Sequence, residues 1–326
     1  MVRYVAGLPK SNHPAPISFA SRSMSEPLLT FVRHAGHHLA VISHPNPSAT
    51  RLPVVWIHGL TASVRFWEAA MYPEIRAERS WYSISLPLHH PSTYDGNIST
   101  DEISEVLLAE LVHRAVEATV PAGAFHMVGY SLGGFACLNY AAKFPGRVRS
   151  VVSVGGFMRG RAKGLEGVLQ FFSAGTLFRK ALFHAGWWIM QRHVIFLKIA
   201  TLAYARQWRR LLRYPYLDAT LRNIFPDVSR HSITGQRVLF RYLLDMDLLD
   251  ETDHLDIPTL VMAGTADPII PYAHQAECAR RLPRGQLLPL AGVGHVAFAE
   301  AALDFHDSLI DWLRDHDQDT SGVTTN

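Results

Sequence analysis

The sequence predicts an α/β fold, with a mostly parallel central sheet flanked by helices and an inserted helical cap. Short apolar segments alternate with helical patterns over much of the chain, which is typical of parallel strands joined by crossover helices. The interval 157–256 has helical periodicity and is too long for a loop, so we expect it to form the cap. A Gly-x-Ser-x-Gly turn at 129–133 stands between a predicted strand and a predicted helix.

Each predicted strand is a short apolar run bounded by turn residues or by a change of periodicity. The expected strands are 39–43, 53–57, 81–86, 124–128, 148–154, 257–263 and 286–290. A helix is expected over 101–118, where apolar residues recur at helical spacing after an acidic first turn. A last helix is expected over 296–314.

These elements divide the chain into four parts. The core is expected to comprise 31–156 and 257–315, and the cap or lid is expected to comprise 157–256. Residues 1–30 mix proline, serine and charges without an apolar stretch, so we interpret them as an N-terminal arm without a secretory signal. The polar residues 316–326 are expected to be a disordered tail.

Composition excludes several classes of protein. With 48% hydrophobic residues, the chain is neither disordered nor an evident integral membrane protein. Leu182–Tyr204 is apolar enough to raise the question of a membrane span, but Gln191-Arg192-His193 in its middle argues against one. The two cysteines, Cys137 and Cys278, do not make a disulfide framework, which favours the cytoplasm.

The predicted cap is strongly basic and rich in aromatic residues. Residues 157–241 contain fifteen Lys or Arg but only three acidic residues. This pattern fits peripheral docking on an anionic membrane surface. The favoured alternative is that the aromatic residues form the lid core and line a substrate pocket; for the pocket we expect Phe171, Phe172, Trp187 and Trp188. No nucleic-acid recognition motif accompanies the charge, so a nucleic-acid partner is not expected.

The turn Gly129-Tyr130-Ser131-Leu132-Gly133-Gly134 carries a candidate nucleophile. Its glycines let strand and helix approach closely, and its serine is held in a strained conformation with the hydroxyl at the helix N-terminus. A glycine-rich turn that only packs is the alternative. The flanking strand and helix favour a functional Ser131.

A serine hydroxyl needs a base, usually a histidine oriented by a carboxylate. Asp267 follows one predicted strand in Gly264-Thr265-Ala266-Asp267, and His295 follows the next in Gly292-Val293-Gly294-His295. Asp267 by itself could be an Asp-Pro turn former, and His295 is one of 18 histidines. Their positions at strand ends, after Ser131 in the chain, predict a Ser-Asp-His triad.

A third strand end supplies His58-Gly59-Leu60. Acyl transfer forms a tetrahedral oxyanion that two backbone N–H groups can stabilise. We expect these groups to belong to Leu60 and Leu132, and we expect His58 to hold the loop without acting as a base.

These four motifs, in this order, resemble those of the α/β-hydrolase superfamily over about 39–314. The resemblance implies the corresponding fold with a lid, and a chemistry shared by esterases, lipases, thioesterases, C–C bond hydrolases, cofactor-free haloperoxidases and acyltransferases. No cofactor is expected. The pairs His37-His38 and His89-His90 lack further spaced ligands, so no metal is expected. Many relatives carry Asp-x-x-Gly-x-Gly-x-Ser where this chain has Ser85–Ser92, which leaves the path of that loop open.

The leading hypothesis is a serine hydrolase that cleaves a carboxylic ester or thioester of a lipophilic acyl substrate through an acyl-enzyme on Ser131. An acyltransferase, or a C–C bond hydrolase or haloperoxidase-type relative, would use the same triad. A non-enzymatic alternative is a membrane- or partner-binding protein on a hydrolase scaffold. We expect a cytoplasmic location, with peripheral membrane contact through the lid as an open alternative.

Overall fold

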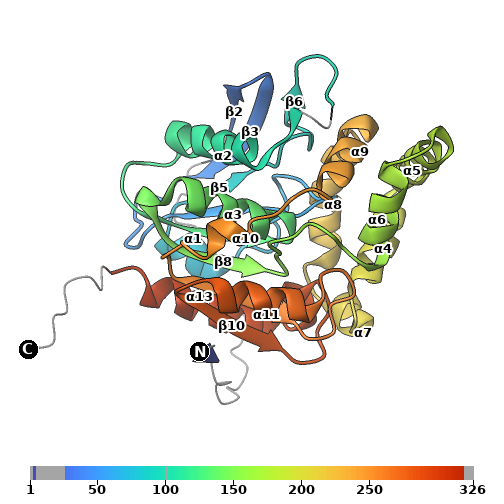
Figure 1. The fold of residues 1–326 in the computed structure, drawn as a ribbon. Coiled ribbons are helices and arrows are strands. Elements are labelled where there is room, and N and C mark those ends of the chain that lie inside the picture. The colour runs from blue at the N-terminus through green and yellow to red at the C-terminus, as the bar shows by residue number, and fades with distance from the viewer. Residues whose placement is uncertain (1–2, 5–25, 100–101, 319–326) are drawn as a thin grey trace, which may run out of the picture.

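The computed structural model describes residues 3–4, 26–99 and 102–318, which form one sheet and the helices around it (Figure 1). Within those residues the sheet has ten strands in the order β1-β10-β9-β8-β7-β4-β5-β3-β2, with β6 paired to β3. The strands are β1 (Arg3–Tyr4), β2 (Leu28–His34), β3 (His37–His44), β4 (Val54–Ile57), β5 (Trp81–Ile84), β6 (Thr93–Tyr94), β7 (Phe125–Tyr130), β8 (Val148–Val154), β9 (Thr259–Gly264) and β10 (Gly285–Leu290). The helices are α1 (Pro73–Glu78), α2 (Glu105–Thr119), α3 (Leu132–Lys143), α4 (Gly164–Ser173), α5 (Leu177–Met190), α6 (Val194–Tyr204), α7 (Trp208–Arg213), α8 (Leu217–Val228), α9 (Ile233–Tyr242), α10 (Leu249–Thr252), α11 (Tyr272–Arg281), α12 (Ala297–Glu300) and α13 (Ala302–Asp315).

The central strands are parallel and buried on both faces. The strands from β5 through β4, β7, β8 and β9 to β10 run parallel, and every residue of β4, β5, β7 and β9 is buried. Strands covered on both faces are apolar at consecutive positions, which explains the continuous apolar runs in the sequence. The predicted fold class, a mostly parallel sheet flanked by helices, is confirmed.

An edge strand was missed by the sequence analysis. β2 pairs antiparallel with β3, and its residues are exposed or half-buried. A strand of this kind mixes polar with apolar residues and gives a weak sequence signal. It begins at Leu28, so it overlaps the end of the predicted arm 1–30. Arg3–Tyr4 pair with β10, and residues 5–25 lie outside the described residues.

Along the chain, the helices from α4 to α9 come after β8 and before β9. Figure 1 shows them to one side of the sheet. The amide of Asn223 in α8 donates to the Arg65 carbonyl (2.9 Å), and that of Gln236 in α9 donates to the Leu88 carbonyl (2.8 Å). Both acceptors lie in core loops, so α8 and α9 attach this helical layer to the core. The helices α4, α5 and α6 contact one another farther from the sheet. The whole layer lies within the interval 157–256.

The apolar segment Leu182–Tyr204 is divided between two helices. α5 ends at Met190 and α6 begins at Val194, with Arg192 between them. In the part of the chain that the structure describes, every helix is too short or too polar to cross a bilayer.

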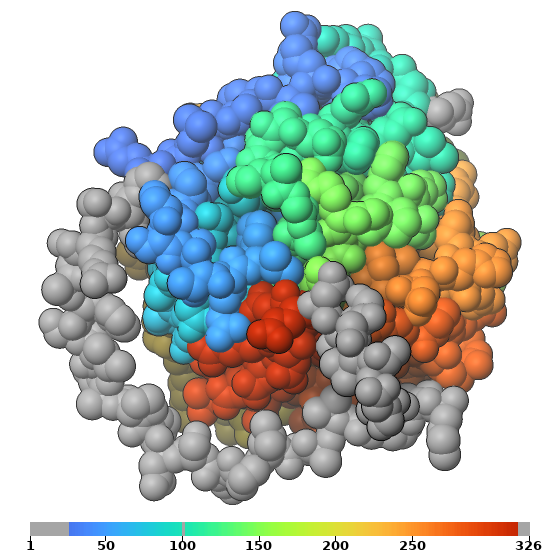
Figure 2. Space-filling view, turned by 90° about the vertical axis from the view of Figure 1, so that its left-hand side faces the viewer, coloured from blue at the N-terminus to red at the C-terminus, as the bar shows by residue number. Residues whose placement is uncertain are grey.

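The chain after α13 is fixed at Asp317, inside the segment 316–326 that was predicted to be disordered. The Asp317 side chain is 10% exposed and accepts hydrogen bonds from Arg79 (2.7 and 2.8 Å) and Arg51 (2.8 Å). Figure 2 shows the red C-terminal helix against the blue segment near residues 50–79. The prediction was wrong here because composition does not reveal partners so distant in the sequence. Residues 319–326 lie outside the described residues.

Candidate active site

Ser131 lies in a strained turn between β7 and α3. Its φ is +54°, a value that residues with side chains rarely adopt. Two glycines make the turn possible: a Cβ on Gly129 would lie 2.1 Å from the Gly133 carbonyl oxygen, and one on Gly133 would lie 2.3 Å from that of Ile57. The turn therefore packs β7, α3 and the end of β4 against one another and places Ser131 at the carboxyl edge of the sheet.

The structure brings Asp267 and His295 together. The His295 Nδ1 atom lies 2.8 Å from Asp267 Oδ2, and both side chains are buried. The Asp267 carboxylate also accepts hydrogen bonds from the amides of Ile269 (2.8 Å) and Ile270 (3.0 Å) and from the Gln275 side chain (3.0 Å). These donors keep the carboxylate oriented, so His295 Nδ1 carries a proton and Nε2 is a free acceptor.

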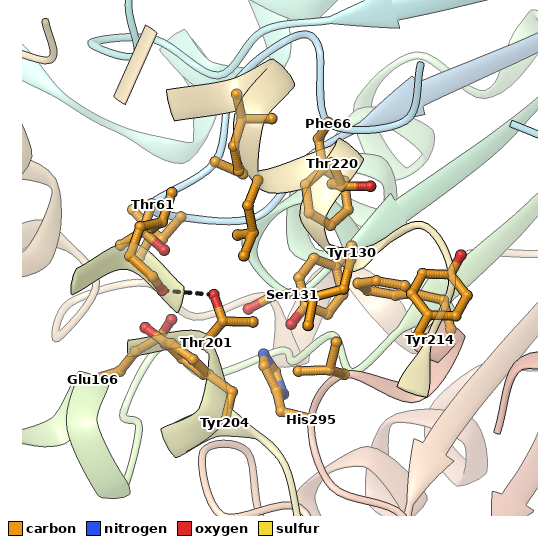
Figure 3. A pocket seen from close by; sticks show the side chains of 18 residues that line it. Thr61, Phe66, Tyr130, Ser131, Glu166, Thr201, Tyr204, Tyr214, Thr220 and His295 are labelled. Atoms are coloured by element: carbon orange, nitrogen blue, oxygen red, sulfur yellow. Dashed lines mark hydrogen bonds between the residues drawn. The ribbon is translucent and has the colours of Figure 1, made fainter. Parts of the chain in front are cut away.

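The Ser131 hydroxyl and the His295 Nε2 atom line one cavity (Figure 3). Both atoms are buried, and neither has a hydrogen-bond partner among the described residues. Buried polar groups are nearly always paired, and an exception requires an explanation. A nucleophile and its base, which tighten their contact only when substrate binds, are such an explanation.

The charge around His295 favours its protonated form. Burial by itself would lower the pKa of His295, but the nearby Asp267 carboxylate and its hydrogen bond outweigh burial and raise that pKa above 6.5. Glu166 and Glu300 add to the rise. The site therefore stabilises an imidazolium whenever His295 takes up a proton.

Leu60 and Leu132 stand where the sequence analysis placed them, after β4 and at the first position of α3. Within the described residues, no hydrogen-bond acceptor is found for the backbone N–H group of either. The first N–H groups of a helix lack intrahelical acceptors and favour a negative charge. The two amides are thus free to bind an oxyanion.

Two neutral histidines hold the loop that carries Leu60. His58 donates from Nδ1 to the Gly59 carbonyl (2.8 Å) and accepts at Nε2 from the Leu86 amide (3.1 Å), and burial lowers its pKa well below 6.5. From the segment between α8 and α9, His231 donates from Nε2 to the Ala62 carbonyl (2.9 Å). His58 does not line the cavity, which fits a structural role.

The segment Ser85–Ser92 packs behind this loop. The buried His89 ring lies edge-on to those of His58 and His231, with ring centres 5.0 Å apart in both pairs. No residue of the segment lines the cavity. Among the described residues, no group of three or more His, Cys, Asp or Glu is arranged to hold a metal ion.

The cavity has a volume of about 60 Å³ and lies between the core loops and helices α4, α6 and α8. Its walls are largely apolar. The apolar lining residues include Leu60, Phe66, Leu197, Leu217, Leu221, Ile224, Val296 and Phe298. The polar lining residues other than Ser131 and His295 include Thr61, Glu166, Thr201, Tyr204, Tyr214 and Thr220.

The four aromatic residues predicted to bind substrate do not line this cavity, so that prediction was wrong. Trp187 is buried against Phe240 of α9 (ring centres 5.7 Å apart). Phe171 and Trp188 are 52% and 51% exposed, and Phe172 is half-buried elsewhere. Composition indicated an aromatic lid, but only the helix orientations decide which side chains face inward.

The sequence profile of the alpha/beta hydrolase fold family matches residues 53–302, which include Ser131, Asp267 and His295. The chain belongs to the α/β-hydrolase family. It is therefore an α/β-hydrolase enzyme, as the four sequence motifs indicate.

Individual relatives of this α/β-hydrolase are distant. The dihydrolipoyllysine-residue acetyltransferase component of the acetoin-cleaving system of Pseudomonas putida is 28% identical over 278 residues, which are 81% of this chain but 64% of that protein. The pimeloyl-acyl-carrier-protein methyl ester esterase of Neisseria meningitidis is 25% identical over 271 residues, 79% of this chain and 78% of the esterase. The solved structure of an α/β hydrolase from a Medee basin deep-sea metagenome superposes with a TM-score of 0.70 at 14% identity, covering 90% of this chain and 100% of that one.

Glu166 is a buried carboxyl in the cavity that the sequence analysis did not single out. It lies on helix α4, and the Tyr204 hydroxyl makes hydrogen-bonding contacts with both Glu166 and Thr61. Burial raises the pKa of Glu166 to about 7, against the opposing charge of His295 and with the help of Asp267. Its sequence signal is that it is one of only three acidic residues in the basic interval 157–241.

Glu300 is a second buried carboxyl, and it joins the segment between α6 and α7 to the loop that carries His295. Its Oε2 atom accepts from the amides of Arg206 (2.9 Å), Gln207 (2.6 Å) and Gly294 (3.1 Å), and Oε1 accepts from the amide of Val296 (3.3 Å). The last two amides flank His295 in the chain. A charged residue inside the apolar run 296–303 was the available sequence signal.

Proposed function

We propose that this α/β-hydrolase cleaves a carboxylic ester or thioester of an apolar acyl group through an acyl-enzyme on Ser131. One observation carries the proposal. A buried serine hydroxyl and a buried histidine nitrogen, both without partners among the described residues, face the same cavity, and the histidine is held by Asp267.

The proposed reaction has two halves with the same proton path. His295 Nε2 takes the Ser131 proton as Oγ attacks the carbonyl carbon, and the tetrahedral oxyanion accepts hydrogen bonds from the Leu60 and Leu132 amides. Collapse of this intermediate expels the alcohol or thiol, which receives the proton from Nε2. A water molecule then attacks the acyl carbon in the same way and releases the acid and free Ser131.

The apolar lining of the cavity supports a lipophilic acyl group. A largely apolar site binds hydrocarbon by burial, and the polar side chains among its walls orient the bound group. The methyl ester esterase named among the relatives also supports ester cleavage. The acetyltransferase name belongs to a relative of which this chain spans 64%, and acyl transfer to an acceptor other than water would need the same triad.

Covalent labelling tests the proposal directly. A fluorophosphonate probe should label the wild type at Ser131, and Ser131→Ala should remove labelling and lower the turnover of p-nitrophenyl alkanoates by about a thousandfold or more. Ser153→Ala is the matched control, because Ser153 is another buried serine with an unpartnered hydroxyl but lies outside the cavity. It should retain both signals.

A well-folded wild type that takes no label would contradict the proposal and favour a binding role. A series of esters and thioesters of increasing chain length then identifies the acyl group. Adding competing alcohols or amines and analysing the products distinguishes hydrolysis from acyl transfer.

A further inference from the structure

Exposed apolar side chains are concentrated on the outer surface of the lid. Among the described residues, thirteen of the eighteen exposed large apolar side chains lie between residues 168 and 216. They are Val168, Phe171, Leu177, Phe178, Leu182, Trp188, Ile189, Ile195, Phe196, Ile199, Trp208, Leu212 and Tyr216. We call these thirteen residues the lid surface. Such a concentration of exposed apolar side chains in one part of a protein marks a candidate interaction site.

Helix α5 contributes most to the lid surface. Its Phe183 and Trp187 are buried against Phe240 of α9, whereas Leu177 and Phe178 are 84% and 71% exposed. In Figure 1, α5 is the helix farthest from the sheet, at the edge of the molecule. The core of the lid therefore uses one side of α5 and leaves an apolar side without a protein partner in the described structure.

The charge around the lid surface is almost entirely positive. Residues 164–213 contain eight Lys or Arg and one acid, Glu166, which is buried in the cavity. Lys198 pairs with Asp218 (2.7 Å), and the other seven basic residues form no ion pair within the described part of the chain. These seven are Arg179, Lys180, Arg192, Arg206, Arg209, Arg210 and Arg213. The same surface of a second copy would repel it, whereas an anionic surface would attract it.

Several of these arginines lie directly over exposed aromatic rings. The Arg179 guanidinium is 4.0 Å from the centre of the Phe171 ring, and that of Arg192 is 4.0 Å from the centre of the Trp188 ring. At a bilayer surface, aromatic rings enter the boundary between headgroups and acyl chains, and cationic groups reach the lipid phosphates. Each pair thus places an aromatic ring and a cationic group at the same position of the lid surface.

We propose that the lid surface docks on an anionic lipid bilayer, with α5 and α6 lying in the plane of the membrane interface. This proposal concerns binding and does not depend on the chemistry at Ser131. It also bears on the cavity, because α6 contributes residues both to the lid surface and to the cavity wall.

Helix α6 separates the lid surface from the cavity. Leu197, Thr201 and Tyr204 line the cavity, and Ile199 lies on the exposed side of the same helix. A bilayer touching α6 would therefore lie about 10 Å, one helix diameter, from the cavity. Docking thus places the bilayer against a helix that forms one wall of the cavity.

Vesicle flotation of the full chain tests the docking. The wild type should float with vesicles of phosphatidylcholine and phosphatidylglycerol, float much less with phosphatidylcholine alone, and be released by high salt. The double variant Phe178→Ser, Trp188→Ser should lose flotation. The double variant Arg179→Glu, Arg192→Glu should weaken binding to anionic vesicles by at least about fivefold.

Phe31→Ser is the matched control, because Phe31 is 48% exposed on β2, away from the lid. It should float like the wild type. Circular dichroism should show that every variant is folded, and fluorophosphonate labelling reports separately on Ser131. Absence of flotation with anionic vesicles, or equal flotation with both vesicle types, would overturn the proposal. A wild-type dimer that dissociates in the serine double variant would also overturn it, because the lid surface would then join two copies.

Discussion

The hydrogen bond between Asp267 and His295 allows a prediction about the pH dependence of catalysis. The carboxylate orients His295 and raises its pKa, so Asp267→Asn removes both effects while keeping the size of the side chain. We expect kcat to fall by about 10³–10⁴-fold. The acid limb of the kcat/KM profile should move to lower pH, because a histidine without the adjacent negative charge loses its proton more easily.

Profiles of kcat/KM between pH 5 and 9, measured with a p-nitrophenyl ester, check this prediction. Asp253→Asn is the control, because Asp253 is exposed. An acid limb that stays in place in Asp267→Asn would show that another group raises the pKa of His295.

From the raised pKa of Glu166 we predict that the protein loses stability as the pH rises towards neutrality. Its pKa is raised to about 7 in the folded state, so the carboxyl stays protonated there after it would have ionised in the unfolded chain near 4.5. The unfolded state then releases its proton first, and the free energy of unfolding falls as the pH rises from about 4.5 to beyond 7. The difference between the two pKa values corresponds to about 3 kcal/mol at most.

Glu166→Gln should remove this loss. Urea unfolding at pH 5 and pH 8 measures it: the variant should be more stable than the wild type at pH 8 by up to about 3 kcal/mol, and the gap should narrow at pH 5. Glu26→Gln, at an exposed position, should leave the wild-type dependence unchanged. Parallel curves for the wild type and Glu166→Gln would contradict the prediction.

The sequence identified some site residues and missed others for a physical reason. Ser131, Asp267 and His295 each follow a strand and stand beside glycines or turn residues, so local patterns mark them. Glu166 and Glu300 belong to no local sequence motif, because their roles arise from burial against segments far away in the chain. A charged residue in an unfavourable sequence context was the only signal available.

At the scale of elements, Glu300 makes α12 a link between the helical layer α4–α9 and the loop that carries His295. Glu300→Ala leaves four amide groups without their acceptor, and each of the two buried ones, those of Gly294 and Val296, costs about 1–3 kcal/mol. We expect a large loss of stability, measured as a fall in Tm, and a fall in kcat, because two of the amides flank His295.

Glu300→Gln distinguishes positioning from simple destabilisation. A glutamine keeps one acceptor oxygen, so it should restore most of the Tm lost in Glu300→Ala. If the carboxylate positions His295, kcat should recover only in part while KM stays near the wild-type value. A recovery of kcat in proportion to Tm would assign Glu300 a purely structural role.

The strands were easier to predict than the faces of the lid helices. The runs 53–57 and 148–154 became β4 and β8 because strands buried on both sides are apolar throughout. A helix with apolar residues on several sides does not reveal which side faces inward. In α5 the structure buries Phe183 and Trp187 and exposes Trp188, which the sequence pattern could not distinguish.

At the scale of the whole molecule, one buried ion network joins the two ends of the core. Asp317, which follows α13, binds Arg79 and Arg51, and its Oδ1 atom lies 3.3 Å from His126 Nε2 of β7. His126 Nδ1 in turn lies 2.8 Å from the hydroxyl of Ser150 in β8. The C-terminal segment is thus tied to the segment that precedes β5 and to two central strands.

This network predicts that Asp317→Asn destabilises the protein in a pH-dependent way. Burial by itself would raise the pKa of Asp317, but hydrogen bonds from His126, Arg79 and Arg51 outweigh it and hold the pKa well below 3.8. The carboxylate therefore contributes stability above the unfolded pKa near 4, and this contribution is lost as the pH falls towards the lower folded value. Removing one member of a buried ion pair costs about 3–5 kcal/mol, because the Arg79 charge is left buried without its partner.

Urea unfolding at pH 7 should show this loss relative to the wild type, and the difference should shrink at pH 3. Asp315→Asn, at an exposed position two residues earlier, should be nearly neutral at both pH values. Equal stabilities of Asp317→Asn and the wild type at pH 7 would mean that the network does not hold the C-terminal segment to the core.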